Sequence, residues 1–109
     1  MISWEDFEKI DIRVGTIIEA LPFEKARNPS YRLKIDFGES GTRNSAAQIT
    51  ALDSTEELIE KQVIAVVNFP PKQIANFFSE CLVLGVYNES KDVVLLQPSK
   101  QVGNGDKIG

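Results

Sequence analysis

The segment from Tyr31 to Phe37 constrains the fold of this 109-residue chain more than any other segment. Its residues alternate strictly between apolar and charged: Tyr31, Arg32, Leu33, Lys34, Ile35, Asp36 and Phe37. A period of two places the apolar side chains on one face of a β-strand and the charged ones on the other. Gly and Ser at 38–41 predict a turn, and Arg43 to Thr50 is expected to return as the second strand of a hairpin.

Further short strands follow from apolar runs bounded by turn residues. They are predicted at Ile12 to Ala20, Gln62 to Val67, Cys81 to Tyr87 and Val93 to Gln97. Gly15 inside the first of these predicts a bend or a bulge. Residues 72–80, which carry Phe77 and Phe78, are predicted to form a loop.

Two short helices are predicted from their capping residues. Ser3 with Asp6 favours a helix from Ser3 to Lys9. Ser54 with Glu57 forms the Ser-x-x-Glu capping pattern, which predicts a helix from about Thr55 to Glu60, between the third and fourth strands. This order favours an all-β fold: a five-stranded oligonucleotide/oligosaccharide-binding (OB) Greek-key barrel, as one domain over residues 1–109. A small β-sandwich, the alternative, uses similar strands.

Composition excludes several function classes. The absence of histidine excludes Ser-His-Asp and Cys-His catalysis and imidazole metal sites. The single cysteine, Cys81, forms no intrachain disulfide and no thiolate zinc site, which fits a reducing cytoplasm. The sequence therefore predicts no catalytic residue, no metal and no cofactor, and we expect a protein that is not an enzyme.

The start of the chain lacks the basic and apolar regions of a signal peptide, and the apolar runs are far too short to cross a membrane. We therefore expect a cytoplasmic protein that does not insert into membranes.

The charge is unevenly distributed. The net charge of −4 excludes a uniformly basic nucleic-acid binder, but residues 25–50 hold five basic residues against two acidic ones. Arg32 and Lys34 share one face of a strand, and Arg43 on the return strand is expected to join them. The phosphate-contact candidates are Arg27, Arg32, Lys34, Arg43 and Lys72, with Phe69, Phe77 and Phe78 near enough to offer stacking surfaces. The alternative is that the basic residues form an ordinary solvated face of a half-buried hairpin.

Several blocks of sequence resemble the tRNA-binding domain family. They are Asp-Ile-Arg-Val-Gly-Thr-Ile at 11–17, Leu-Lys-Ile-Asp-Phe-Gly at 33–38, Val-Asn-Phe-Pro-Pro-Lys-Gln-Ile at 67–74 and Ser-Glu-Cys-Leu-Val-Leu-Gly at 79–85, followed by Leu-Gln-Pro at 96–98 and Gly-Asn-Gly at 103–105. The resemblance runs from about Phe7 to Gly109 and is strongest to the small stand-alone members of the family, which are export-related chaperones. It implies an OB barrel that forms a homodimer, with residues 1–10 and 98–109 as dimerisation extensions. It implies unfolded or precursor polypeptides as partners, with the secretion machinery as a further one. Larger relatives, which are attached to aminoacyl-tRNA synthetases, bind tRNA.

The resemblance also implies a binding groove. By motif, Asn68, Ser79 and Glu80 line it, and Ser45 and Gln48 fall on the strand that borders it. If the partner is a polypeptide, we expect Phe77 or Phe78 to contact its apolar side chains. Two departures weaken a direct transfer of tRNA contacts: Cys81-Leu82 stands where tRNA-binding relatives have Gly-Met, and 24–29 lacks their His-Pro-x-Ala stretch.

A purely structural role is the alternative for several of these residues. Asn68 would then satisfy a turn, and Ser79 would cap a loop. Trp4 and Phe7 either bury against a twofold mate, which we favour, or cap their own barrel. We expect a non-enzymatic homodimeric chaperone, with a tRNA- or structured-RNA-binding module as the alternative.

Overall fold

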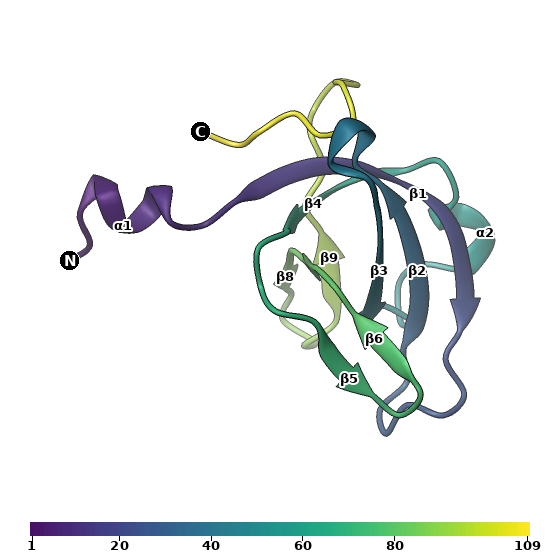
Figure 1. The fold of residues 1–109 in the computed structure, drawn as a ribbon. Coiled ribbons are helices and arrows are strands. Elements are labelled where there is room, and N and C mark those ends of the chain that lie inside the picture. Colours follow the sequence, from purple (N-terminus) through teal and green to yellow (C-terminus); the bar gives the residue numbers. More distant parts are fainter.

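In the computed structural model, which describes residues 1–109, antiparallel strands curl into a nearly closed barrel (Figure 1). The barrel has five strands in the order β3-β2-β1-β4-β7. They are β1 (Ile12–Pro22), β2 (Tyr31–Asp36), β3 (Thr42–Ala47), β4 (Gln62–Val66) and β7 (Leu82–Val83). The other elements are α1 (Trp4–Glu8), a 3-10 turn (Gly38–Ser40), α2 (Thr55–Leu58) and the hairpins β5 (Lys72–Ile74) with β6 (Phe77–Ser79) and β8 (Gly85–Tyr87) with β9 (Val93–Leu95). The predicted all-β OB-type barrel, with a helix between β3 and β4, is confirmed.

The alternating segment supplies much of the core. Leu33, Ile35 and Phe37 are almost completely buried and pack with Ile17 of β1. Helix α2 adds the fully buried Leu58, and its start is fixed by the predicted capping box between Ser54 and Glu57. The core therefore lies inside the barrel, and the charged residues of β2 lie on its outer face.

The bulge in β1 lies later than predicted. The register shifts between Ile17 and Glu19, whereas Gly15 pairs regularly with Val63. A Cβ atom at Gly15 would lie only 2.6 Å from the Ile35 side chain and 2.7 Å from the Phe37 ring. Gly15 is therefore required by the close packing of these side chains over the strand, and not by a bend.

Two predicted segments differ in the structure. Residues 72–80, predicted as a loop, form the β5–β6 hairpin, whose tip turns through Ala75 with a φ of 53°. Alanine rarely adopts this conformation, so Ala75 itself gives no turn signal, and Asn76 is the one usual turn residue at the tip. The predicted strand from Cys81 to Tyr87 is divided, because the chain leaves the barrel after β7 to form β8 with β9.

Both termini extend from one side of the barrel (Figure 1). Helix α1 buries none of its residues; Trp4 is 68% exposed and lies against Phe7, with ring centroids 5.4 Å apart. The proposed alternative, that these two rings cap their own barrel, is therefore wrong for this chain.

The C-terminal tail pairs with β1. The Val14 N–H donates to the Asp106 carbonyl, and the Gly105 N–H donates to the Val14 carbonyl. Neither helix is long enough to cross a membrane.

Candidate binding surface around the β5–β6 hairpin

Ser79, at the end of β6, and Glu80, directly after it, close the barrel against the edge of β3. The Asn44 N–H donates to Glu80 Oε1 at 2.9 Å, and the Glu80 N–H donates to the Asn44 carbonyl at 2.8 Å. The Ala46 N–H donates to Ser79 Oγ at 3.1 Å. No strand pairing joins β3 to β7 directly, so these side chains satisfy edge amides that a strand would otherwise bind.

Ser45 also belongs to this closure. Its hydroxyl donates to the Cys81 carbonyl at 3.0 Å, and the residue is only 1% exposed. Strand β3 turns this side chain toward the interior, where Ser45 pairs with the buried Leu33, so its hydroxyl serves the closure of the barrel. Ser79 and Glu80 are half-buried, and Ser79 still lines a hollow at the base of the hairpin.

Cys81 follows directly and is buried. Burial raises the pKa of its thiol to about 11, because the thiolate would lose its hydration. The thiol is therefore protonated at neutral pH. This environment is that of a structural cysteine and not of a nucleophile.

Asn68 fastens α1 to the barrel. Its Oδ1 accepts from the Asp11 N–H at 2.9 Å, and its Nδ2 donates to the Lys9 carbonyl at 2.8 Å. Both halves of the amide are thus engaged by the main chain that links α1 to β1. This is the backbone-satisfying role that the sequence left open for Asn68.

The structure separates Arg43 from Arg32 and Lys34. Arg43 pairs with Ile35, whereas Arg32 pairs with Ala46 and Lys34 with Asn44. Directly paired residues project to the same face of a sheet, so Arg43 lies on the face opposite to Arg32 and Lys34. Its Nη1 donates to the Val67 carbonyl at 2.9 Å, while its buried Nε has no partner. The prediction that Arg43 joins the other two cations is wrong by one position of register.

Arg32 lies on two aromatic rings. Its Cζ is 5.6 Å from the ring centroid of Phe77 and 5.8 Å from that of Phe23, and the two rings meet edge to face at 5.4 Å. The guanidinium makes no hydrogen bond or ion pair within the chain. Phe23, which the sequence analysis did not select, thus helps to hold a cation whose donors are free.

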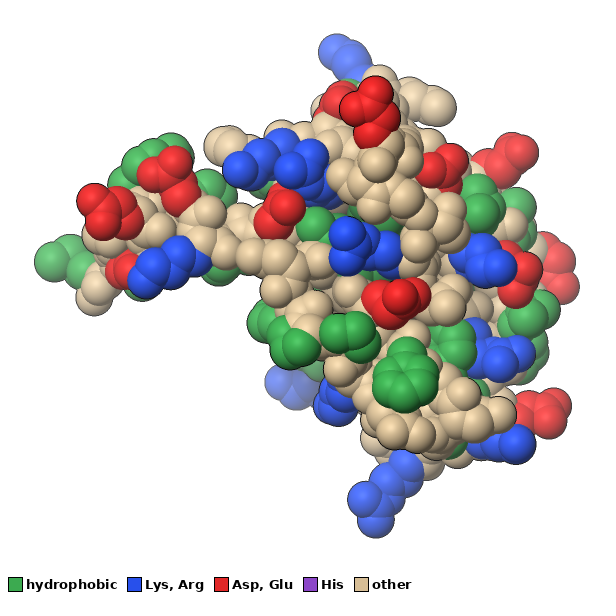
Figure 2. Space-filling model, viewed as in Figure 1, with side chains coloured by type: hydrophobic (Ala, Val, Ile, Leu, Met, Phe, Trp, Pro, Cys, Tyr) green, Lys and Arg blue, Asp and Glu red, His purple; other side chains and the backbone are tan.

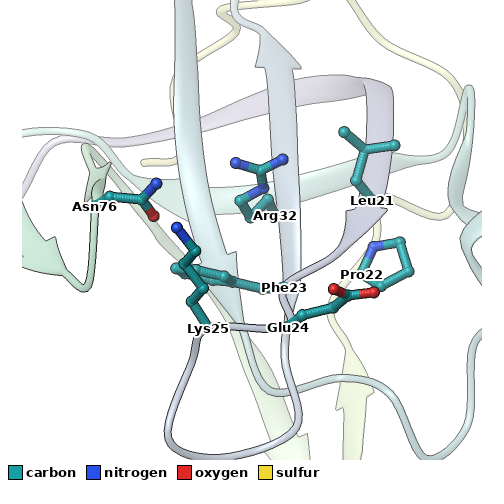
Figure 3. Close-up of a pocket in the computed structure, with 7 residues that line it drawn as sticks. All are labelled: Leu21, Pro22, Phe23, Glu24, Lys25, Arg32 and Asn76. Carbon is teal, nitrogen blue, oxygen red and sulfur yellow. The ribbon is translucent and has the colours of Figure 1, made fainter.

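Hollows adjoin Arg32 on either side. One of about 360 Å³ also contains Leu21, Pro22, Phe23, Glu24, Lys25 and Asn76 (Figure 3). The other, of about 190 Å³, also contains Glu19, Leu33, Lys34, Asn44 and Phe77. The basic residues of β2 and the preceding loop therefore border recessed surface near the hairpin tip. Arg27 lies in that loop and is exposed.

A more apolar hollow lies at the base of the hairpin. It measures about 440 Å³ and is lined by Phe69, Pro70, Pro71, Lys72, Ser79, Cys81 and Leu82. Phe69 and Leu82 are each about half exposed. Apolar side chains are visible over the side of the molecule that carries this hairpin (Figure 2). Gln48 lies elsewhere, in an apolar hollow of about 310 Å³ between the end of β3 and the β7–β9 segment.

An antiparallel barrel with a helix between β3 and β4, and with basic, aromatic and apolar surface on its outside, is a binding fold of the OB class. Residues 12–107 match the family described as "Putative tRNA binding domain". The chain belongs to this family.

Solved structures extend the match over the whole chain. The CsaA chaperone of Bacillus anthracis str. Ames is 53% identical, with a TM-score of 0.95, over 100% of this chain and 99% of its own. The CsaA chaperone protein of Picrophilus torridus is 55% identical, with a TM-score of 0.94, over 100% of both chains. The expected resemblance to the stand-alone chaperones of the family is confirmed.

Relatives with a larger architecture are also similar. The methionine–tRNA ligase of Methanococcoides burtonii is 34% identical over 108 residues, which are 99% of this chain and 16% of that protein. The chain thus spans about a sixth of such a relative. The family and its neighbours support a chaperone or tRNA-binding module, and the synthetases are enzymes through their other domains.

Proposed function

We propose that this protein is a non-enzymatic cytoplasmic chaperone that binds unfolded or precursor polypeptides as a homodimer and assists their export. The observation that carries the proposal is full-length likeness to two CsaA chaperones at 53% and 55% identity. The chain has no histidine, and its one thiol is buried and protonated, which agrees with a role without covalent chemistry.

The hollow at the base of the hairpin is the surface best suited to a polypeptide. Unfolded chains expose apolar side chains, and a space of about 440 Å³ bordered by Phe69 and Leu82 can bury one of them. Strand β5 pairs only with β6, so its outer edge is open to main-chain hydrogen bonds from an extended segment. Apolar pockets and a free edge together would bind many sequences without strict specificity.

Helix α1 supports the homodimer. Trp4, Phe7 and the exposed Ile2 form an apolar end that the chain's own barrel does not cover. A second copy, related by a twofold axis, would cover the same residues on both chains. Two copies of a weak polypeptide site would then raise avidity through effective concentration.

The test is binding of a labelled, permanently unfolded polypeptide, such as reduced and carboxymethylated α-lactalbumin, measured by anisotropy. Changing Phe69→Ser together with Leu82→Ser should weaken binding about tenfold, because two apolar contacts are lost. The matched control is Val86→Ser with Val94→Ser, an exposed cross-strand pair on β8–β9, which should bind as the wild type does. Equal binding by both double variants would remove the hairpin base from the site.

A second candidate function is RNA binding. It is favoured by the family match and by Arg32 and Lys34, which lie on one face without an acidic partner. Labelled bulk tRNA titrated over a salt series, with the unfolded polypeptide as competitor, distinguishes the two. Tight, steeply salt-dependent binding that the polypeptide does not displace would favour RNA.

A further inference from the structure

Arg32 is oriented but not neutralised. Phe23 and Phe77 hold its guanidinium, at 5.8 and 5.6 Å from the ring centroids, yet no acceptor in the chain engages it. Glu24 and Glu19 line the hollows on its two sides, and neither carboxylate forms an ion pair with it. A guanidinium has five N–H donors in a fixed plane, so this site offers an unused bidentate fork for an oxyanion.

The surroundings of Arg32 favour a phosphate with a base attached. Lys25 borders one hollow and Lys34 the other, so three cations follow one another across the surface. Arg32 and Lys34 are two residues apart on a strand, a separation of about 7 Å. A repeating phosphate backbone matches several cations in a row, whereas a single peptide carboxylate would use only one of them.

The larger hollow can accept an unpaired base. Leu21, Pro22 and Phe23 supply apolar surface there, beside the Arg32 side chain (Figure 3). A base within a duplex cannot enter a recess, but one splayed from a single strand can stack on aromatic or guanidinium planes.

We propose that Arg32, with Lys25 and Lys34, forms a binding site for unpaired nucleotides of an RNA strand, and that this site is filled independently of the polypeptide hollow. The proposal rests on the second candidate function and deepens it. The two hollows lie at opposite ends of the β5–β6 hairpin: Asn76 at the tip lines one, and Phe69 to Lys72 at the base line the other. They share no lining residue, and the three-residue strands between them span about 10 Å.

The experiment measures the anisotropy of a labelled oligouridylate hexamer with four forms of the full chain: wild type, Arg32→Gln, Arg32→Lys and Lys91→Gln. Lys91 is the matched control, since it is an exposed cation at the turn of the β8–β9 hairpin that forms no ion pair and lines neither hollow beside Arg32. Arg32→Gln should bind at least tenfold more weakly, as expected for the loss of charge-assisted hydrogen bonds. Arg32→Lys should also be clearly weakened, because it keeps the charge but not the fork. Lys91→Gln should change affinity less than threefold.

Two further measurements keep the result interpretable. Thermal melting of each variant checks its fold, and anisotropy of the unfolded polypeptide checks the hairpin base. Arg32→Gln should bind the polypeptide normally, and saturating polypeptide should leave the hexamer bound to the wild type.

The possible results distinguish failure of the proposed Arg32 site from failure of the proposed RNA-binding function. Equal losses in Arg32→Gln and Lys91→Gln, with tRNA still bound, would overturn the site and leave RNA binding intact. Absence of RNA binding by the wild type even at low salt would overturn both. Displacement of the hexamer by the polypeptide would overturn the independence of the two hollows. Displacement by a short oligoglutamate at equal charge concentration would assign Arg32 to acidic peptides instead.

Discussion

At the scale of single residues, the barrel is closed by side-chain hydrogen bonds where main-chain pairing between strands is absent. The Glu80 carboxylate accepts a hydrogen bond from the Asn44 N–H, and the Ser79 hydroxyl accepts one from the Ala46 N–H. The Ser45 hydroxyl donates to the Cys81 carbonyl. Strands β3 and β7 are the two ends of the sheet and do not pair. Ser79 and Glu80 therefore have a structural role: they close the barrel at the edge of β3.

Removing the Glu80 acceptor should destabilise the barrel. We expect Glu80→Ala to lower the free energy of unfolding by about 1 to 3 kcal/mol, since the half-buried Asn44 amide loses a charged acceptor. Glu80→Gln should lose less, because its amide oxygen can still accept. Urea unfolding followed by fluorescence measures both. Glu39→Ala, a change at an exposed glutamate of the 3-10 turn, is the control and should stay within about 0.5 kcal/mol of wild type.

Cys81 should make stability depend on alkaline pH. Burial raises the pKa of the folded thiol to about 11 from its ordinary value of 9.0, so between these values only the unfolded chain loses the proton. The unfolded state then binds fewer protons, and the free energy of unfolding falls as pH rises through this window. The expected loss is about 2 to 3 kcal/mol relative to Cys81→Ala, in which this dependence is absent. Urea midpoints of both proteins from pH 8 to 11 give the difference, and parallel curves would contradict it.

At the scale of elements, the sequence predicted those parts whose signals are local. The alternation in β2 and the capping box of α2 each lie within a few residues, and both are present in the structure. The β5–β6 hairpin was missed because its turn places Ala75 at positive φ, a position where Gly or Asn is usual. The bulge was misplaced because Gly15 serves packing from a strand that is distant in sequence.

The same limit applies to the candidate site: local patterns could be predicted from the sequence, but contacts between distant segments could not. The shared face of Arg32 and Lys34 follows from the period of two, and the structure keeps it. Whether Arg43 joins them depends on the register of β2 with β3, which the turn sets and the sequence does not reveal. Phe23 could not be selected either, because its role exists only once the loop before β2 meets the hairpin tip.

The linker between α1 and β1 is held by Asn68, and this role can be tested directly. Asn68→Ala removes both bonds to the main chain of residues 9–11, so local opening there should become easier by about 1 kcal/mol. Hydrogen exchange of the Asp11 amide should accelerate about fivefold, and trypsin should cut sooner after Lys9. Asn88→Ala, at the turn of the β8–β9 hairpin, is a distant control that should leave both readouts unchanged. Unaltered exchange in Asn68→Ala would show that other contacts hold the linker.

At the scale of the whole molecule, charge and apolar surface are distributed by region. Helix α1 carries Glu5, Asp6 and Glu8 beside its aromatic rings, and acidic side chains are visible on the projecting helix (Figure 2), whereas Arg32 and Lys34 lie on β2 of the barrel. The radius of gyration, 13.8 Å, is slightly above the roughly 13 Å of a compact chain of this size, as a projecting helix requires. An exposed apolar helix end that the chain's own core does not cover is typical of an interaction surface.

The homodimer proposal makes Trp4 the residue to change. If two α1 helices meet around a twofold axis, each Trp4 is buried by the other copy, and Trp4→Ala removes the largest contact twice. Light scattering after size exclusion should then move from about twice the chain mass toward the 12.1 kDa of one chain, increasingly so on dilution. Tyr87→Ala is the matched control, because this aromatic is 73% exposed on the β8–β9 hairpin, away from α1. Dissociation in Trp4→Ala alone would place the interface at α1. A dimer that persists in Trp4→Ala, or a wild type that is already a monomer, would show that the exposed rings of α1 are not what holds two copies together.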